Sequence, residues 1–446
     1  MSTREPADLL IEARWLLPIE PAGEPLRDHA VAVSAGRIIA AGPAAQLRAR
    51  FTPREHVVRE RHALLPGLVN AHARAAHALL CGLPVRGPRA RWLTDTVLPV
   101  EERCMSAAFV RDGTRVAMAA MLRAGITCFA TVDLFPEEAA RAAAAAHMRA
   151  AIGLPVADGA TAWAEGATAH LARAERLWDE YRSDARISLY FAPLALRGMS
   201  DATLARVRRV ADELDARVAV HIAELGGEPD GPAAAEVRDA AGPRDGISLR
   251  VPALRRLDAL GLLRPGFTAI GAGACDASEL ELLSLRGACL VACPQADLRL
   301  GAGWGPITAL DSDRTGLGTD SPAAAGAFDL LAETRTAALL AGLPAREALR
   351  TATLGGATAL GLGAHIGSIE PGKAADLLCI DLEAECEGAA RPEDTIVFAA
   401  TRAQVSDVWT AGRSAVRAGR LLAFEESELL AVTQRWAQRA RLGAAA

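Results

Sequence analysis

The chain has 446 residues, of which 51% are hydrophobic and 23% are charged, and its formal net charge at pH 7 is −5. This composition excludes an intrinsically disordered chain, and the length predicts a large core with a second, smaller unit beside it. Basic and acidic residues are interspersed, and no apolar run reaches the ~20 residues of a membrane span. We therefore expect neither nucleic-acid binding nor membrane anchoring.

The start of the chain lacks the apolar core of a signal peptide, and the eight cysteines include no Cys-x-x-Cys pair. Cys289 and Cys293 are four positions apart, on one expected strand and its exit. Reduced, buried thiols in a cytoplasmic protein explain this usage best.

Both ends of the chain have the texture of short strands. Residues 7–60 contain apolar or alternating runs around a turn at Gly36, and residues 370–422 contain similar runs around Gly412. We expect these two segments to build one small β-sandwich. Residues 425–446 are typical of a C-terminal helix, either exposed or docked.

The middle of the chain, residues 61–367, alternates strands with helices, the pattern of a parallel sheet. Helices are expected at 136–148, 201–214, 278–285 and 328–341, among others. Eight strand–helix units favour a closed (β/α)8 TIM-type barrel over an open sheet. The expected strands are 64–70, 126–131, 150–156, 187–193, 217–223, 267–271, 288–293 and 315–320.

The first of these strands ends in a polar tip. Residues 64–69 are mainly apolar, and His72, Arg74 and His77 follow. In a (β/α)8 barrel, the carboxyl ends of the strands form the active site. Because residue 74 is two positions after His72, both side chains are expected on the same side of the strand end, facing the barrel mouth.

Several separated segments match one family in the same order. They are Leu65-Pro66-Gly67-Leu68-Val69-Asn70-Ala71-His72, His221-Ile222-Ala223-Glu224, Leu317-Gly318-Thr319-Asp320 and Ile366-Gly367-Ser368-Ile369-Glu370-Pro371-Gly372-Lys373. With them, the chain resembles the 5′-methylthioadenosine/S-adenosylhomocysteine deaminases, in the chlorohydrolase and cytosine-deaminase-like branch of the amidohydrolase superfamily. The resemblance covers residues from about 8 to 422.

This resemblance implies a zinc site whose metal-bound water attacks a ring carbon that bears an amino group. In the family, zinc is held by two histidines of strand 1, one histidine each of strands 5 and 6, and an aspartate of strand 8. A glutamate of the strand 5 motif moves protons. Carried over by motif, the metal ligands are His72, His221 and Asp320, the acid/base is Glu224, with Asp320 also in the catalytic set, and Glu101 and Arg149 are substrate-binding.

The departures from the family pattern are concentrated in this site. Arg74 stands where the second strand 1 histidine is expected, and Gly271 and Ala274 stand at the histidine positions of strand 6. After His221 the chain has only one more histidine, His365, which lies outside the expected strands. A shifted alignment therefore cannot supply a strand 6 imidazole.

Two hypotheses follow. In the first, the chain is a metal-poor pseudoenzyme that keeps the fold to bind a nucleoside-like small molecule or to pair with an active relative. In the second, it is a zinc hydrolase with a reduced set of His72, His221 and Asp320. We favour the first, because the permanent charge of Arg74 and the missing ligands act together. The family is commonly oligomeric, so a homo-oligomer is possible.

The first hypothesis makes a geometric prediction about Arg74. Without a metal ion, Asp320 and Glu224 would face each other as uncompensated carboxylates in a pocket of low dielectric. A guanidinium can hold a carboxylate with two parallel hydrogen bonds. We therefore expect the Arg74 side chain to replace the metal, within ~2.7–2.9 Å of Asp320 or Glu224.

Overall fold

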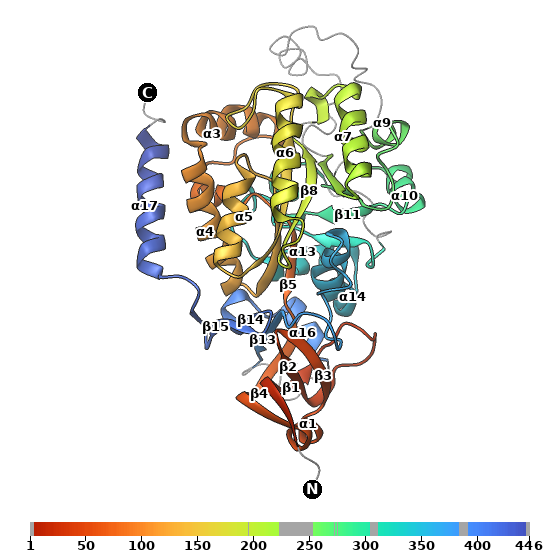
Figure 1. The fold of residues 1–446 in the computed structure, drawn as a ribbon, viewed down its shortest axis with the longest axis vertical. Helices are drawn as coiled ribbons and strands as arrows, with labels where there is room; N and C mark the ends of the chain where they lie inside the picture. The colour runs from red at the N-terminus through yellow and green to blue at the C-terminus, as the bar shows by residue number, and fades with distance from the viewer. Residues whose placement is uncertain are drawn as a thin grey trace.

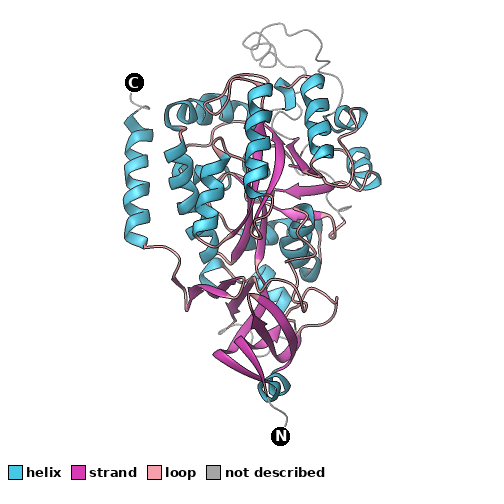
Figure 2. Ribbon diagram, viewed as in Figure 1, coloured by secondary structure: helices cyan, strands magenta, loops and turns pink. Residues whose placement is uncertain are grey.

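The computed structural model describes residues 4–194, 196–222, 253–271, 273, 275–303, 311–382 and 391–442. It contains two eight-stranded sheets, one inside a ring of helices and one beside it, near the N-terminus (Figures 1 and 2). The first sheet forms a (β/α)8 barrel, and the second is built from both ends of the chain. Both predictions about the fold class are confirmed.

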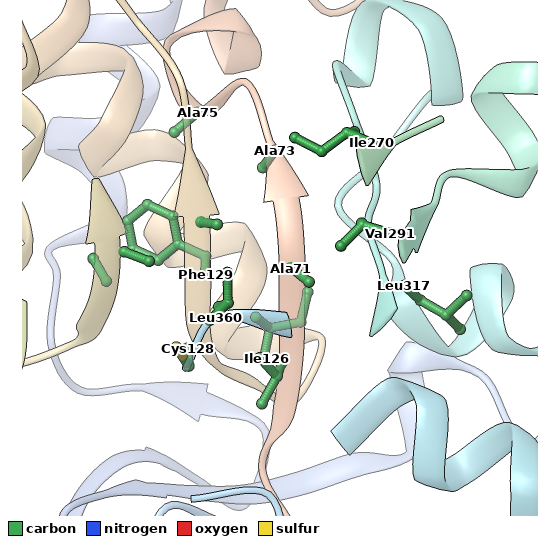
Figure 3. Close-up of a cluster of buried hydrophobic side chains, with 14 of the residues drawn as sticks. Ala71, Ala73, Ala75, Ile126, Cys128, Phe129, Ile270, Val291, Leu317 and Leu360 are labelled. Atoms are coloured by element: carbon green, nitrogen blue, oxygen red, sulfur yellow. The ribbon is translucent and has the colours of Figure 1, made fainter. Parts of the chain in front are cut away.

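All neighbouring strands of the barrel pair in parallel, in sequence order. A parallel bridge between Ala73 and Asp320 joins the first strand to the segment after the last. The buried apolar residues of the barrel strands belong to one hydrophobic cluster, and Figure 3 shows Ala71, Phe129 and Ile270 among them. The strands are β5 (Leu68–Ala73), β6 (Ile126–Thr131), β7 (Arg149–Val156), β8 (Ile187–Pro193), β9 (Arg217–His221), β10 (Phe267–Ile270), β11 (Cys289–Ala292) and β12 (Thr315–Leu317).

The helices cover the outside of the barrel, and some have clear end signals. Ser200 caps α7, because its side chain accepts a hydrogen bond from the Thr203 backbone N–H. The main helices are α3 (Leu98–Cys104), α4 (Ala107–Arg123), α5 (Pro136–Ala145), α6 (Ala167–Tyr181), α7 (Asp201–Glu213), α9 (Ala253–Ala259), α10 (Ala277–Leu285), α11 (Pro294–Arg299), α13 (Leu330–Ala341) and α14 (Ala345–Arg350).

The second sheet joins the chain ends through β4, which pairs in parallel with β1 and antiparallel with β13. Apolar clusters form on this sheet around Ile11 and around Phe51. Its strands are β1 (Glu5–Leu16), β2 (Leu26–Ser34), β3 (Arg37–Pro43), β4 (Phe51–Pro66), β13 (Leu377–Asp381), β14 (Val405–Thr410), β15 (Arg413–Arg417) and β16 (Arg420–Leu421).

The first barrel strand starts later than predicted. Residues 64–66 complete β4 in the terminal sheet, and β5 begins only at Leu68. Gly67 makes the change of sheet: its N–H donates to the Asp376 carbonyl, and a Cβ at this position would lie 2.0 Å from Thr127 Oγ1. One apolar run therefore contributes residues to both sheets, and hydrophobicity alone does not show where the first strand ends and the second begins.

The last helix, α17 (Glu426–Leu442), packs along α4 (Figure 1). Trp436 is buried, and its indole N–H donates to Asp112 at 2.9 Å. Its ring meets Phe109 edge-on, with the ring centroids 5.2 Å apart. None of the described helices is both long and apolar enough to cross a membrane.

Candidate functional site at the barrel mouth

The site is assembled where β5 ends and the segment after β12 folds against it. The backbone N–H groups of Thr319 and Asp320 both donate to the His72 carbonyl, at 2.9 and 3.1 Å. Gly318 allows this close approach, because a Cβ there would lie 2.7 Å from the same carbonyl oxygen. Asp320 has a φ of 49°, the left-handed region that non-glycine residues rarely adopt. Such strain is typical of functional sites and fixes the direction of the carboxylate.

Three predicted ligand residues meet here. His72, His221 at the end of β9 and Asp320 each offer a ligand atom, and these atoms lie within 4.8 Å of one another. Within the described part of the chain, both ring nitrogens of His72 and Nδ1 of His221 are buried without a hydrogen-bond partner, and His72 Nε2 lies 3.7 Å from Asp320 Oδ1. Two imidazoles and a carboxylate are ligands of a kind that binds transition metals, so the cluster fits a metal ion in donor type and spacing.

A guanidinium already contacts this cluster, and it belongs to Arg89. Arg89 opens the short helix α2 (Arg89–Trp92) in the loop after β5. Its Nη2 donates to Asp320 Oδ2 at 2.9 Å and lies 3.3 Å from Asp297 Oδ1, while its Nη1 lies 3.4 Å from His221 Nε2. The prediction that an arginine would face Asp320 is therefore correct in kind, but it named the wrong arginine.

The Arg74 side chain points instead to Glu101 on α3, with Nη2 2.9 Å from Oε1. The same carboxylate oxygen lies 2.5 Å from His77 Nε2, and His77 Nδ1 lies 2.9 Å from Ser321 Oγ. The expected pairing of Arg74 with Asp320 needs correction, because Glu101 is the nearer acidic partner. Glu101, expected to contact substrate, binds two side chains of the protein.

Burial and the arginines together set the charge of the site. Burial alone would raise the pKa of Asp320, but the Arg89 guanidinium outweighs it and holds the pKa well below its usual range. Burial, with Arg89 close by, keeps the pKa of His221 well below its usual value, so its ring is neutral. Burial raises the pKa of Asp297 to about 7, although Arg89 opposes this. The geometry thus favours an ionised Asp320 beside a permanent cation.

Three positions after strands 5 and 6 matter for a metal site in the family pattern. Gly271, directly after β10, has no side chain to offer and a φ of 77°. Glu224, the predicted acid/base, lies outside the described residues, as does Ala274. The pairing of Arg74 with Glu224 is therefore still a prediction.

Arg149 is not part of this constellation. It is the first residue of β7, at the end of the barrel opposite to the site. Its Nε donates to Asp376 at 3.0 Å, Nη1 donates to the Ala185 carbonyl, and Asp376 also accepts from the Ala411 N–H. The expected substrate-binding role needs correction: Arg149 ties the bottom of the barrel to the terminal sheet.

We expect Arg149→Met to lower the free energy of unfolding while leaving the affinity of the barrel mouth for a small-molecule ligand within a factor of two. The variant breaks a buried ion pair far from the pocket. Urea denaturation and titration calorimetry measure the two effects. Arg182→Met is the matched control, because that side chain is 65% exposed in a surface pair. A tenfold loss of affinity at unchanged stability would return Arg149 to the substrate-binding set.

The cluster lines a cavity of about 40 Å³ at the mouth of the barrel. Both arginines, Arg74 and Arg89, reach the pocket, and apolar side chains form part of its wall. The lining residues are His72, Arg74, His77, Arg89, Trp92, Leu93, Val132, Ala192, Pro193, Leu194, Ala219, His221, Ile270, Asp320 and Ser321.

Sequence reasoning missed Arg89 and Asp297. Arg89 is one of three arginines in residues 86–91, a run that usually indicates a solvated loop. The one available signal is the adjacent Trp92, whose large apolar ring predicts that part of this loop is buried. Asp297 follows Pro294 by one helical turn, and nothing in its local sequence distinguishes it from a surface acid.

Comparison with known proteins places the chain among enzymes with this architecture. The model of the amidohydrolase family matches residues 63–415. A 5-methylthioadenosine/S-adenosylhomocysteine deaminase of Teredinibacter turnerae is 34% identical over an alignment of 455 positions that covers 100% of both chains. A zinc-bound adenosine deaminase structure from Xanthomonas campestris is 40% identical, with a TM-score of 0.91 over 99% of this chain and 100% of that one. Atrazine chlorohydrolase TrzN from Arthrobacter aurescens TC1, with zinc, shares the fold at 21% identity and a TM-score of 0.83, over 96% and 100%.

Proposed function

The chain belongs to the amidohydrolase family, and we propose that it binds an adenosine-like compound in the pocket of a hydrolytic deaminase whose catalysis is impaired. The main support for impaired catalysis is the contact of Arg89 with two of the three candidate metal ligands, Asp320 and His221. The lining of the pocket supports binding of a small molecule. The contacts of Arg89 with the candidate metal ligands oppose turnover.

The proposal about the ligand rests on the pocket and on the relatives. Deaminases of methylthioadenosine, S-adenosylhomocysteine and adenosine match the chain over nearly its whole length. The apolar walls suit a purine ring or a thioether, and the charged side chains at the base suit polar ring atoms. A nucleoside-like small molecule agrees with both the relatives and the lining of the pocket.

A catalytic zinc ion does not fit beside Arg89. Zinc needs its nitrogen and oxygen ligands at about 2.0–2.2 Å. The same carboxylate of Asp320 and the Nε2 atom of His221 already lie 2.9 and 3.4 Å from guanidinium nitrogens. A doubly charged ion there would lie within a few ångströms of a permanent cation. Gly271 adds no ligand, so we assign no reaction step to a metal.

The second candidate function is a zinc hydrolase with a reduced ligand set. It is favoured by the buried, unpartnered nitrogens of His72 and by the spacing of the cluster. It requires the Arg89 side chain to leave Asp320 and His221. Metal content and turnover of the unmodified protein distinguish the two candidates.

We expect the full chain, purified without chelator, to carry well under one zinc per molecule and to release no ammonia from methylthioadenosine or S-adenosylhomocysteine. Elemental analysis and a coupled ammonia assay measure this, and calorimetry with methylthioadenosine measures binding. The zinc-bound deaminase from Xanthomonas campestris is the positive control for the metal measurement. Stoichiometric zinc with turnover would establish the reduced-ligand hydrolase instead.

A further inference from the structure

Arg89 is held in the site by its backbone as well as by its side chain. Its N–H donates to the Leu300 carbonyl at 3.1 Å, so the start of α2 is fixed to the end of α11. Three residues on, Trp92 is 2% exposed, and its indole N–H donates to the Pro84 carbonyl at 3.2 Å. The loop is therefore anchored on both sides of the point from which the guanidinium enters.

The side chain meets a set of groups that needs a cation. Arg89 is 7% exposed, and both carboxylates that it contacts, Asp297 and Asp320, are more deeply buried. Two buried carboxylates that contact the same guanidinium nitrogen would repel each other without a positive charge between them. The planar fork of a guanidinium reaches several acceptors at once, and its charge is permanent.

We propose that Arg89 is the built-in cation of this site and excludes metal ions from His72, His221 and Asp320. This inference depends on the proposed function in one respect: it assumes that His72, His221 and Asp320 correspond to the metal ligands of the family. Arg89 and a metal compete for the same carboxylate of Asp320 and the same nitrogen of His221, so their occupancies are mutually exclusive. Removing the guanidinium is then enough to open a site with three ligands.

The test is a titration of the apo full chain with Co²⁺, followed by the visible absorption of bound cobalt. We expect no saturation of the unmodified protein over the titrated range, and saturable binding of one Co²⁺ per chain by Arg89→Met with a Kd at least tenfold below the upper end of that range. Arg91→Met is the matched control, because Arg91 lies on the same short helix with a side chain that is 71% exposed. It is expected to behave like the unmodified protein. Adding Asp320→Asn to Arg89→Met is expected to abolish the new binding.

Arg89→Lys separates charge from side-chain volume: it keeps a cation and is expected, like the unmodified protein, to show no saturable Co²⁺ binding over the same range. Tight binding by the lysine variant, or no gain in a folded Arg89→Met, would overturn the proposal. If Arg89→Met does not fold, the unmodified protein still decides: saturable binding of one Co²⁺ per chain overturns metal exclusion. Turnover of methylthioadenosine is measured separately, so the proposed function can fail while this inference stands.

Discussion

Arg89→Met is expected to lower the free energy of unfolding by about 3–5 kcal/mol in metal-free buffer, the usual effect of removing one partner of a buried ion pair. In the described part of the chain, the cation within hydrogen-bonding distance of the Asp320 carboxylate is Arg89. The same variant also takes the guanidinium away from Asp297, which is 1% exposed. Urea denaturation at pH 7, extrapolated linearly to water, measures the loss.

The surface control is again Arg91→Met, expected to change stability by less than about 0.5 kcal/mol, because its pair with Asp95 is exposed. A loss near zero for Arg89→Met would mean that Asp320 finds another compensating group when the guanidinium is removed. In that case the ion pair is not the reason why the arginine is buried. The stability result is independent of the cobalt titration, since it needs no metal.

The fold was predictable because its signals are distributed along the chain. Eight apolar runs separated by helical periodicity identify a barrel, and β-rich ends on both sides identify a shared sheet. The start of β5 was not predictable, because Leu64 and Leu65 before Gly67 are as apolar as Leu68 and Val69 after it. The change of sheet at Gly67 depends on a tertiary contact with Thr127, to which local sequence gives no clue.

The site was only partly predictable, and the reason is geometric. His72, His221 and Asp320 lie at strand ends, whose meeting point follows from the barrel itself. Arg89 comes from a loop, and a loop can place its side chains in many directions. Electrostatics correctly indicated that a buried Asp320 needs a cation, but it could not choose between Arg74 and Arg89. That choice depends on Glu101, whose carboxylate accepts a hydrogen bond from the Arg74 guanidinium.

Arg149 could have been placed correctly from the sequence. The expected third strand begins at residue 150, so Arg149 precedes it and belongs to the amino end of the barrel. Active sites of this fold lie at the carboxyl ends of the strands. The family resemblance implied a position near the substrate, but the buried ion pair with Asp376 places Arg149 at the amino end, as the topology requires.

The second large effect is expected from Glu101→Gln, which should cost about 3 kcal/mol at pH 7 and progressively less in acid. Burial alone would raise the pKa of Glu101, but Arg74 and the hydrogen bond from His77 outweigh it and lower the pKa from 4.5 to about 2. A carboxyl whose pKa is lower in the folded state contributes stability above its unfolded pKa, and this contribution is lost as the pH falls through the folded value. The difference between 4.5 and about 2 corresponds to about 3 kcal/mol.

Glutamine resembles the protonated glutamate, so the two proteins should converge in stability as the pH falls from about 4.5 toward 2. Urea denaturation at several pH values between 3 and 7 measures the gap. Glu102→Gln is the matched control: the neighbouring side chain is exposed, and the change is expected to stay below about 0.5 kcal/mol at every pH. A gap that does not change with pH would show that Glu101 acts through packing and hydrogen bonding alone. In that case the charges of Arg74, His77 and Glu101 would not stabilise the fold.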